Sequence, residues 1–236
     1  MRGCAAAVCR RKAPTRGSIV SEPGHRPSAA VVFDALGTEY EKAFAGSAAH
    51  RASLQWLLGR LAPGSRVLDV GSGTGRPTAA TLAAAGHRVL GVDVSPVMVD
   101  IASRQVPAAE FRCADVRRMP LDEGAFDAVC VYFSLLQMSR AEQAELVGAL
   151  ARAVRPGGSV VLATVPLDVE GVDAVFMGQP VRVTSFGAAE FGALAEAAGL
   201  TVVARHSAEF TPAHPDAVPE PHLFLYCERG VAPGAG

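Results

Sequence analysis

Along most of the chain, apolar positions at helical spacing alternate with short runs that are apolar throughout. Val32, Leu36, Tyr40 and Phe44 recur every four residues, which predicts a helix over this segment. Further helices are predicted over residues 48–61, 77–85, 96–104, 140–153 and 188–198, and strands over 66–70, 88–92, 109–113, 126–133, 159–165, 200–208 and 222–227. This alternation predicts an α/β domain with a parallel sheet that helices cover on both faces.

The C-terminal third departs from the alternation. Residues 166–181 show no clear periodicity and are predicted to form a loop, followed by a short extra strand at Val181–Val183. The proline-rich segment 212–221 joins the last two strands without a helix, which predicts an antiparallel final strand. We therefore expect a three-layer sandwich around a seven-stranded, mostly parallel sheet.

Composition narrows the class of protein. The chain has 236 residues with 22 basic and 23 acidic side chains, as expected for one domain with a sizeable core. It contains no run of about 18 apolar residues that would predict a membrane span. A net charge near zero argues against nucleic acid as the main partner. The 43 Ala and 20 Arg, against 2 Lys and no Asn, are typical of high-GC codon usage, so we expect a bacterial, cytoplasmic protein.

The charge is unevenly distributed. Residues 1–28 carry six basic side chains and one acidic one, a net charge of +5, whereas the remainder carries −6. Pro14, Pro23, Gly24 and Pro27 follow the basic cluster within this segment. We predict a disordered basic tail over residues 1–28 and one domain over residues 29–236.

Candidate chemistry is concentrated in Val67–Gly75, where Gly71, Gly73 and Gly75 follow a buried strand at alternating positions. Such glycines let the backbone turn sharply and approach a ligand. The spacing differs from a dinucleotide fingerprint, because the third glycine comes one position early. Asp69 precedes the first glycine by two residues, and a carboxylate repels pyrophosphate but attracts an ammonium group. The pattern favours a ligand with a cationic amino acid end over NAD.

This stretch resembles the first motif of class I S-adenosylmethionine-dependent methyltransferases, and later motifs follow in that family's order. Phe126–Val129 resembles the fourth-strand motif, and Leu150–Gly158 with Val160–Leu162 resembles the helix, turn and fifth strand. The resemblance covers residues 31–229 and implies a Rossmann-like fold with an N-terminal helical lid. It also implies S-adenosylmethionine as the cofactor.

The resemblance assigns cofactor contacts to particular residues. Asp93 ends the second strand, where the family places the acid that accepts both ribose hydroxyls. Asp115 and the Val116 amide match the adenine position. The remaining contacts that it implies are Asp69, Gly71, Ser72, Gly73, Gly75, Val94, Met98 and Phe133. Tyr40 lies on the predicted lid, where its ring would face the sulfonium; the alternative is that Phe33, Tyr40 and Phe44 all pack onto the sheet.

No residue is identified as the general base. Many relatives carry a histidine after the fourth strand, whereas Ser134 and four further non-histidine residues follow Phe133 here. His50 and His214 are the weak candidates, because both segments are expected near the ligand. Further candidates are His206 and His222, with Tyr132, Asp168 and Glu170 as weaker options. Amine, thiol and carbanion acceptors need little help from a base, whereas alcohols and phenols benefit from one. No cluster has zinc-ligand spacing, so we predict no metal.

The resulting hypothesis is methyl transfer from S-adenosylmethionine to a small organic molecule, as in secondary metabolism. The core fold uses nearly the whole domain, which leaves the lid and residues 166–184 to shape a small substrate pocket. The alternatives are cyclisation or rearrangement in the same pocket, a non-catalytic cofactor-binding partner, and, least favoured, an NAD-dependent dehydrogenase. We expect a monomer or homodimer with no nucleic acid or membrane partner.

Overall fold

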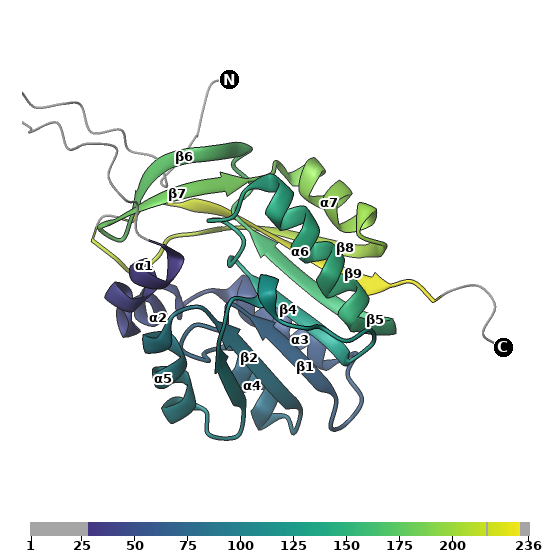
Figure 1. The fold of residues 1–236 in the computed structure, drawn as a ribbon. Coiled ribbons are helices and arrows are strands. Elements are labelled where there is room, and N and C mark those ends of the chain that lie inside the picture. The colour runs from purple at the N-terminus through teal and green to yellow at the C-terminus, as the bar shows by residue number, and fades with distance from the viewer. Residues whose placement is uncertain (1–27, 216, 232–236) are drawn as a thin grey trace, which may run out of the picture.

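Helices and strands alternate through most of the described chain, which comprises residues 28–215 and 217–231 of this computed structural model (Figure 1). The strands are β1 (Arg66–Val70), β2 (Arg88–Asp93), β3 (Glu110–Cys113), β4 (Phe126–Tyr132), β5 (Val154–Thr164), β6 (Val169–Phe176), β7 (Gln179–Ser185), β8 (Leu200–Phe210) and β9 (Glu220–Arg229). The helices are α1 (Ala29–Leu36), α2 (Thr38–Phe44), α3 (Ala48–Leu58), α4 (Thr78–Ala84), α5 (Pro96–Gln105), α6 (Arg140–Ala153) and α7 (Ala188–Ala197), with a 3₁₀ turn, η1, at Val116–Arg118.

The seven strands of the main sheet lie in the order β3-β2-β1-β4-β5-β9-β8. Strands β1 to β5 are mutually parallel, and β9 runs antiparallel to both β5 and β8. The predicted architecture, including the antiparallel last strand, is therefore confirmed. The order reverses beside β1, and in open parallel sheets such a reversal creates a crevice at the carboxyl ends of the strands.

Two apolar clusters hold the layers together. Leu54 and Leu57 of α3 and Leu82 of α4 pack on one face of the sheet. Leu150 of α6 and Phe191 of α7 pack on the other face. All five side chains are at most 1% exposed, as expected when a parallel sheet is covered on both sides.

The predicted N-terminal helix is divided in two. Gly37 has φ +48 and ends α1, with its amide donating to the Phe33 carbonyl, and α2 begins at the next residue. The expectation of one helix through Phe44 is therefore wrong. Its apolar positions still meet, because Val32 and Leu36 pack in a third cluster beside Phe33 and Tyr40.

The predicted loop over residues 166–181 is instead most of a β-hairpin, formed by β6 and β7 with a two-residue connection at Met177–Gly178. Both connecting residues have positive φ, as a tight hairpin turn requires. A register shift between Val169 and Val172 interrupts the alternation that would have predicted a strand. Figure 1 shows the hairpin beside α1 and α2, and its Ala174 and Val183 complete the third cluster.

Two smaller features also differ from expectation. The predicted turn at Pro156–Gly158 is a register shift inside β5, which begins at Val154. Cys113 lies in a segment predicted as a strand, but unlike Cys130 and Cys227 it is exposed, because β3 is an edge strand.

The proposed basic tail, residues 1–28, lies outside the described residues except for Ser28, so it stays a prediction. Within the described ranges, no helix is both long and apolar enough to cross a membrane. The same residues contain no group of three or more His, Cys, Asp or Glu side chains arranged to hold a metal ion.

Candidate functional site

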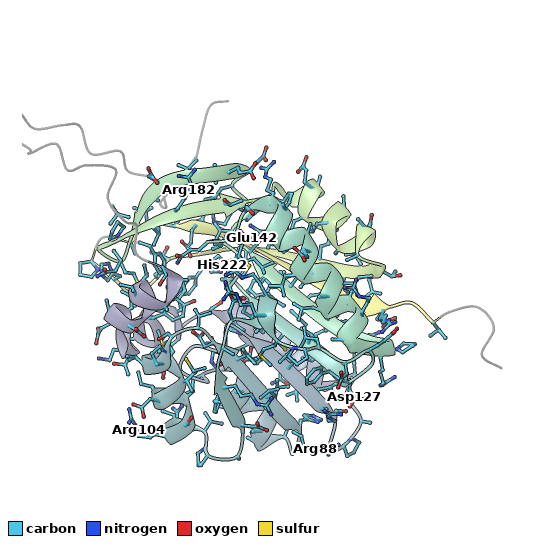
Figure 2. All side chains as sticks on the ribbon, viewed as in Figure 1. Arg88, Arg104, Asp127, Glu142, Arg182 and His222 are labelled. Carbon is cyan, nitrogen blue, oxygen red and sulfur yellow. The ribbon has the colours of Figure 1, made fainter. Side chains whose placement is uncertain are left out.

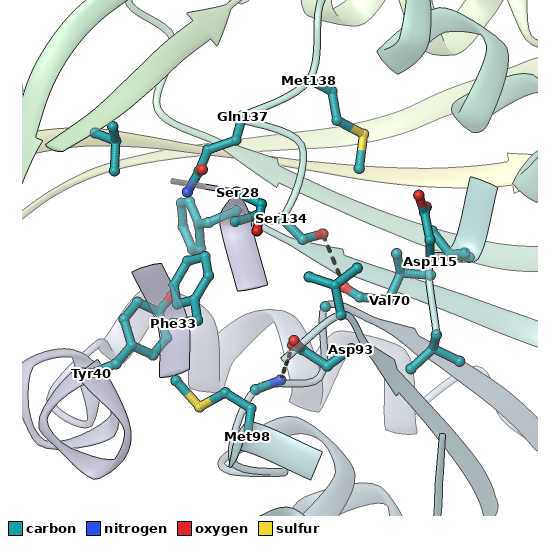
Figure 3. A pocket seen from close by; sticks show the side chains of 18 of the residues that line it. Ser28, Phe33, Tyr40, Val70, Asp93, Met98, Asp115, Ser134, Gln137 and Met138 are labelled. Carbon is teal, nitrogen blue, oxygen red and sulfur yellow. Dashed lines mark hydrogen bonds between the residues drawn. The ribbon is translucent and has the colours of Figure 1, made fainter. Parts of the chain in front are cut away.

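A cavity of about 610 Å³ lies at the carboxyl ends of β1, β2 and β4, beneath the lid formed by α1 and α2. In Figure 3, Phe33 and Tyr40 lie on one side of this cavity and Asp115 on the other, with Asp93 and Val70 between them. Nine of the sequence-predicted contact residues line it, namely Tyr40, Gly71, Gly73, Asp93, Val94, Met98, Asp115, Val116 and Phe133. A second cavity of about 370 Å³ adjoins it and is lined by Asp69 and Ser72.

The glycine-rich turn is shaped for close approach. Gly71 has φ +69, and a Cβ there would lie 2.3 Å from the Ser134 Cβ, so only glycine fits. A Cβ on Gly73 would meet nothing within 4 Å, because this residue borders the open cavity. Gly75 lines neither cavity. It packs instead against Phe111 and Val106, with a hypothetical Cβ 3.0 and 3.1 Å from their side chains.

Asp69 has an unsatisfied, buried carboxyl group. It is 2% exposed, and its Oδ2 has no hydrogen-bond partner among the described residues. Burial and the nearby Asp93 raise the pKa of Asp69 to about 8. A cation beside it would restore the charged form and supply the missing donor. Ser72 Oγ, in the same wall, is also buried and without a partner in the part of the chain that is described.

Asp93 is positioned by backbone donors. Its Oδ2 accepts from the Gly73 amide and its Oδ1 from the Ser95 amide, both at 2.9 Å. Burial nevertheless raises the pKa of Asp93, because desolvation outweighs these bonds. Each carboxylate oxygen has a further lone pair, so the group retains two acceptor positions for a pair of hydroxyls.

Asp115 and Val116 lie at the opposite end of the cavity. Arg117 donates hydrogen bonds to the Asp115 carboxylate from Nε at 2.9 Å and from Nη2 at 2.7 Å, and these bonds lower the pKa of Asp115. The carboxylate is therefore ionised and fixed in orientation. Arg117 also binds Glu142 at 2.6 Å, which connects this end of the cavity to α6.

The lid aromatics border the cavities, and Phe44 also packs on the main sheet, with its ring centroid 5.7 Å from that of Phe210 of β8. Tyr40 stacks against Phe44 with ring centroids 4.9 Å apart and meets Phe33 edge-on at 5.5 Å. Phe176 of the hairpin closes the cluster, 6.2 Å from Tyr40. Burial and the carboxylates of Glu220 and Asp93 raise the pKa of Tyr40, so its hydroxyl stays protonated.

The lid is held in place by polar contacts to α5 and to the residue that caps it. The Ser95 hydroxyl donates to Asp34 of α1 at 2.6 Å, directly beside Asp93. Gln105 of α5 donates to Glu41 of α2 at 3.1 Å. The lid and Asp93 are thus positioned by the same turn at the start of α5.

Phe133 is the strained residue of the site. It follows β4 with φ +58, a left-handed conformation that bulky residues rarely adopt. Its amide donates to Ala163 of β5 at 2.9 Å, which holds the turn. Phe133 and Tyr40 line both cavities described above and a third, apolar cavity of about 80 Å³.

The structure separates the candidate histidines. His50 lines the cavity of Asp69, but its Nε2 is engaged by Thr78 at 3.0 Å, and desolvation lowers the pKa of His50 to about 3. Such a group is a poor proton acceptor near neutral pH. His214 and His206 line none of the three cavities, whereas His222 lines the same one as His50.

The sequence predicts that residues 166–184 shape part of the wall, but it does not identify the individual wall residues in the hairpin, nor Glu220. Asp173, Pro180 and Arg182 of the hairpin line the large cavity because β6 and β7 fold back over it. Glu220 lines the small apolar cavity. The spacing of Glu220 and His222 was the available signal, since residues two apart on a strand share a face.

Comparison with known proteins identifies the family. A model described as a methyltransferase domain matches residues 67–158. An uncharacterized methyltransferase of Synechocystis is 31% identical over 158 residues, which cover 62% of this chain and 71% of that protein. A demethylmenaquinone methyltransferase of Beutenbergia cavernae is 40% identical over 113 residues, covering 48% of this chain and 45% of that enzyme. The match thus spans less than half of that enzyme's length.

Solved structures share the fold. The [4+2]-cyclase SpnF has a TM-score of 0.67 and 21% identity, covering 89% of this chain and 98% of that one. The 1,6-didemethyltoxoflavin-N1-methyltransferase of Burkholderia thailandensis, solved with its substrate and S-adenosylhomocysteine, has a TM-score of 0.61 and 21% identity, covering 85% and 86%. Together with the matched domain and the order of its strands, these similarities show that the chain belongs to the class I S-adenosylmethionine-dependent methyltransferases.

Proposed function

We propose that this chain transfers a methyl group from S-adenosylmethionine to a small organic acceptor. The observation that carries the proposal is Asp69, a buried carboxyl group with an unpartnered oxygen in the cavity wall. An ammonium group is the ligand that this position fits. Arg76 is the one Lys or Arg side chain among the residues lining the same cavity, and it suits the carboxylate of the same amino acid end.

The other predicted contacts fit the rest of the cofactor. Asp93 has an acceptor position for each ribose hydroxyl, and Asp115 with Val116 lies where an adenine amine and ring nitrogen would be received. Met98, 1% exposed, supplies an apolar wall. When bound, S-adenosylmethionine supplies a methyl group activated by its sulfonium. Tyr40 and Phe133 then exclude water and hold the acceptor close.

The acceptor is proposed to be small because the lid and the β6–β7 hairpin enclose the cavity. Both elements belong to one apolar cluster, so the hairpin forms the roof of the pocket. The structural relatives named above, a 1,6-didemethyltoxoflavin-N1-methyltransferase and a [4+2]-cyclase, support this proposal. Secondary metabolism is our proposal for the setting.

Isothermal titration with S-adenosylmethionine and S-adenosylhomocysteine tests the cofactor site. We expect binding of both, and absence of binding up to about 1 mM would refute the proposal. Cyclisation remains the alternative reaction, because a [4+2]-cyclase shares the fold. The mass of the product distinguishes them, since only transfer adds one methylene unit. Binding without turnover would instead favour a non-catalytic partner role.

A further inference from the structure

Glu220 and His222 form a buried pair on β9. His222 Nε2 lies 2.8 Å from Glu220 Oε1, and the two side chains are 1% and 8% exposed, respectively. When Glu220 is a carboxylate it can only accept this hydrogen bond, and Nε2 is then the donor. This contact occupies Oε1, so Oε2 is the carboxylate oxygen that can accept a hydrogen bond from a ligand.

Packing alone gives little reason for this pair. Burying a carboxylate costs desolvation free energy that one hydrogen bond does not fully offset, and apolar residues of similar size often pack equally well. His222 Nδ1 is also buried without a partner among the described residues. The rings nearest to it, Phe133 at 4.4 Å and Phe210 at 5.3 Å, offer no acceptor or donor.

The pair lies in the wall between two cavities. Glu220 lines the apolar cavity of about 80 Å³, and His222 lines the cavity that holds Asp69. Tyr40 and Phe133 line both, so the pair is next to the expected position of the methyl group. Figure 2 shows His222 in the interior of the molecule, whereas Arg104 and Arg182 lie at its margins.

The small cavity has the chemistry of an aromatic subsite. Phe33, Phe44 and Phe176 supply rings, and the remaining apolar lining residues are Ala29, Tyr40, Phe133, Leu136, Val165, Val181 and Val183. Its polar lining residues are Ser134, Gln137 and Glu220, of which Glu220 is the one charged side chain. Such a site suits a flat, mainly apolar group that donates a hydrogen bond to the carboxylate.

From this geometry we propose that Glu220 accepts the hydroxyl proton of a small phenol or enol, that His222 positions Glu220, and that the acceptor ring lies where the small apolar cavity meets the cavity of about 610 Å³, between Phe33, Tyr40 and Phe133. The inference rests on the proposed methyl transfer and adds the acceptor atom, oxygen, and the substrate class.

The proposed step balances. The acceptor hydroxyl proton passes to Glu220 Oε2, and an oxygen electron pair forms the new bond to the methyl carbon. The bond from that carbon to sulfur breaks with its electrons on sulfur, which becomes a neutral thioether. His222 Nε2 donates to Oε1 throughout and keeps the carboxylate in place. Glu220 then releases its proton to water.

Other titratable groups face the pair from neighbouring elements. Tyr40 of α2 stays protonated because its pKa is raised, in part by Glu220. His50 of α3 stays neutral because its pKa is about 3, in part owing to His222. Asp69 of β1 shares a cavity with His222 and would be paired with the ligand ammonium when S-adenosylhomocysteine is bound. Neither Tyr40 nor His50 titrates between about pH 6 and 9.

The test uses 4-nitrophenol as the probe, added to protein saturated with S-adenosylhomocysteine and followed by absorbance, which reports the ionisation of the bound phenol. Wild-type protein is expected to bind the neutral phenol, so affinity falls about tenfold per pH unit above the probe's pKa. Glu220→Gln replaces a repelling carboxylate with an amide donor. This variant is expected to bind the phenolate, and its affinity then stays level as pH rises.

Matched variants separate this role from a structural one. Glu209→Gln makes the same change on β8 at an exposed position and is expected to behave as wild type. His222→Phe is expected to weaken the preference for the neutral phenol, and His222→Gln, which keeps a donor for Glu220, to restore it. If Glu220→Gln does not fold by thermal melting, Glu220→Asp replaces it and should weaken binding of the neutral phenol. With a phenol that turns over, Glu220→Gln is expected to lower kcat about 100-fold with KM unchanged.

The outcomes distinguish the two proposals. Absence of S-adenosylhomocysteine binding refutes the proposed function. If that ligand binds but 4-nitrophenol does not bind at about 1 mM, the substrate class is refuted and the cofactor site stands. If Glu220→Gln retains the wild-type preference for the neutral phenol, Glu220 is not the proton acceptor.

Discussion

Replacing Asp69 with Asn tests the physical argument behind the cofactor site. In the free protein the pKa of Asp69 is about 8, so the carboxyl group is mostly protonated near neutral pH. A ligand ammonium requires the ionised form, and binding must therefore release a proton. Each pH unit below 8 costs about 1.4 kcal/mol, which is tenfold in affinity. The dissociation constant for S-adenosylhomocysteine should fall about 25-fold between about pH 6 and 7.5.

Asp69→Asn removes this dependence because the amide does not titrate. Calorimetry in two buffers of different ionisation enthalpy should detect release of about one proton by wild type at about pH 6.5, and none from this position in the variant. The affinity of the variant should be lower at pH 7.5 and nearly independent of pH. Folding should be retained, since the change removes a buried group that is costly to ionise.

Asp100→Asn is the matched control. Asp100 lies on α5, is 61% exposed and pairs with Arg104, so its loss should leave binding and proton release unchanged. The reasoning is refuted if wild-type affinity is flat over this pH range, or if Asp69→Asn binds S-adenosylhomocysteine with the wild-type pH dependence.

Three further substitutions address the lid, the turn and the ribose acid. Tyr40→Ala should weaken S-adenosylmethionine binding about 2- to 30-fold through loss of a cation–π contact. S-adenosylhomocysteine lacks the positive sulfur, so its affinity, measured by calorimetry, should fall less. Equal losses of affinity for the two ligands would contradict the cation–π contact. Gly71→Ala places a Cβ 2.3 Å from that of Ser134, whereas Gly64→Ala at φ +73 meets nothing within 4 Å. In denaturant titrations the Gly71 variant should therefore lose about 1–3 kcal/mol more stability than the Gly64 variant. Asp93→Asn should lower affinity for S-adenosylhomocysteine about 10- to 150-fold, because hydrogen bonds to a charged group contribute about 1.5–3 kcal/mol. Unchanged binding in calorimetry would show that Asp93 does not receive the ribose.

The main sheet was predictable because its signals are local. Val67 and Leu68 belong to a short apolar run with turn residues on both sides, and such a run suits a strand buried on both faces. The alternation with helices then determines a parallel topology, since a crossover is right-handed and returns to the same sheet. Asp69, Asp93 and Asp115 follow from that topology, because each lies at the carboxyl end of a strand or just after it.

The roof of the cavity was not predictable in the same way. The segment around Gly171 carries a bulge, and its two strands pair only with each other, so no regular alternation marks them. Their apolar side chains have a partner only once α1 and α2 lie beside them. The break between α1 and α2 at Gly37 was not predictable either, because the helical spacing of apolar residues continues across it while the backbone changes direction.

Sequence alone thus determined the sheet, the glycine-rich turn and the acids that border it, because each depends on residues adjacent in the chain. Tertiary structure decided which charges have partners. Asp115 is held by Arg117 and stays ionised, Asp69 Oδ2 is buried without a donor among the described residues, and His50 is desolvated and neutral. The physical reason is that burial and charge at a site depend on segments distant in sequence. Glu220 and His222, for example, can act on a ligand only because the lid and the hairpin form a cavity beside them.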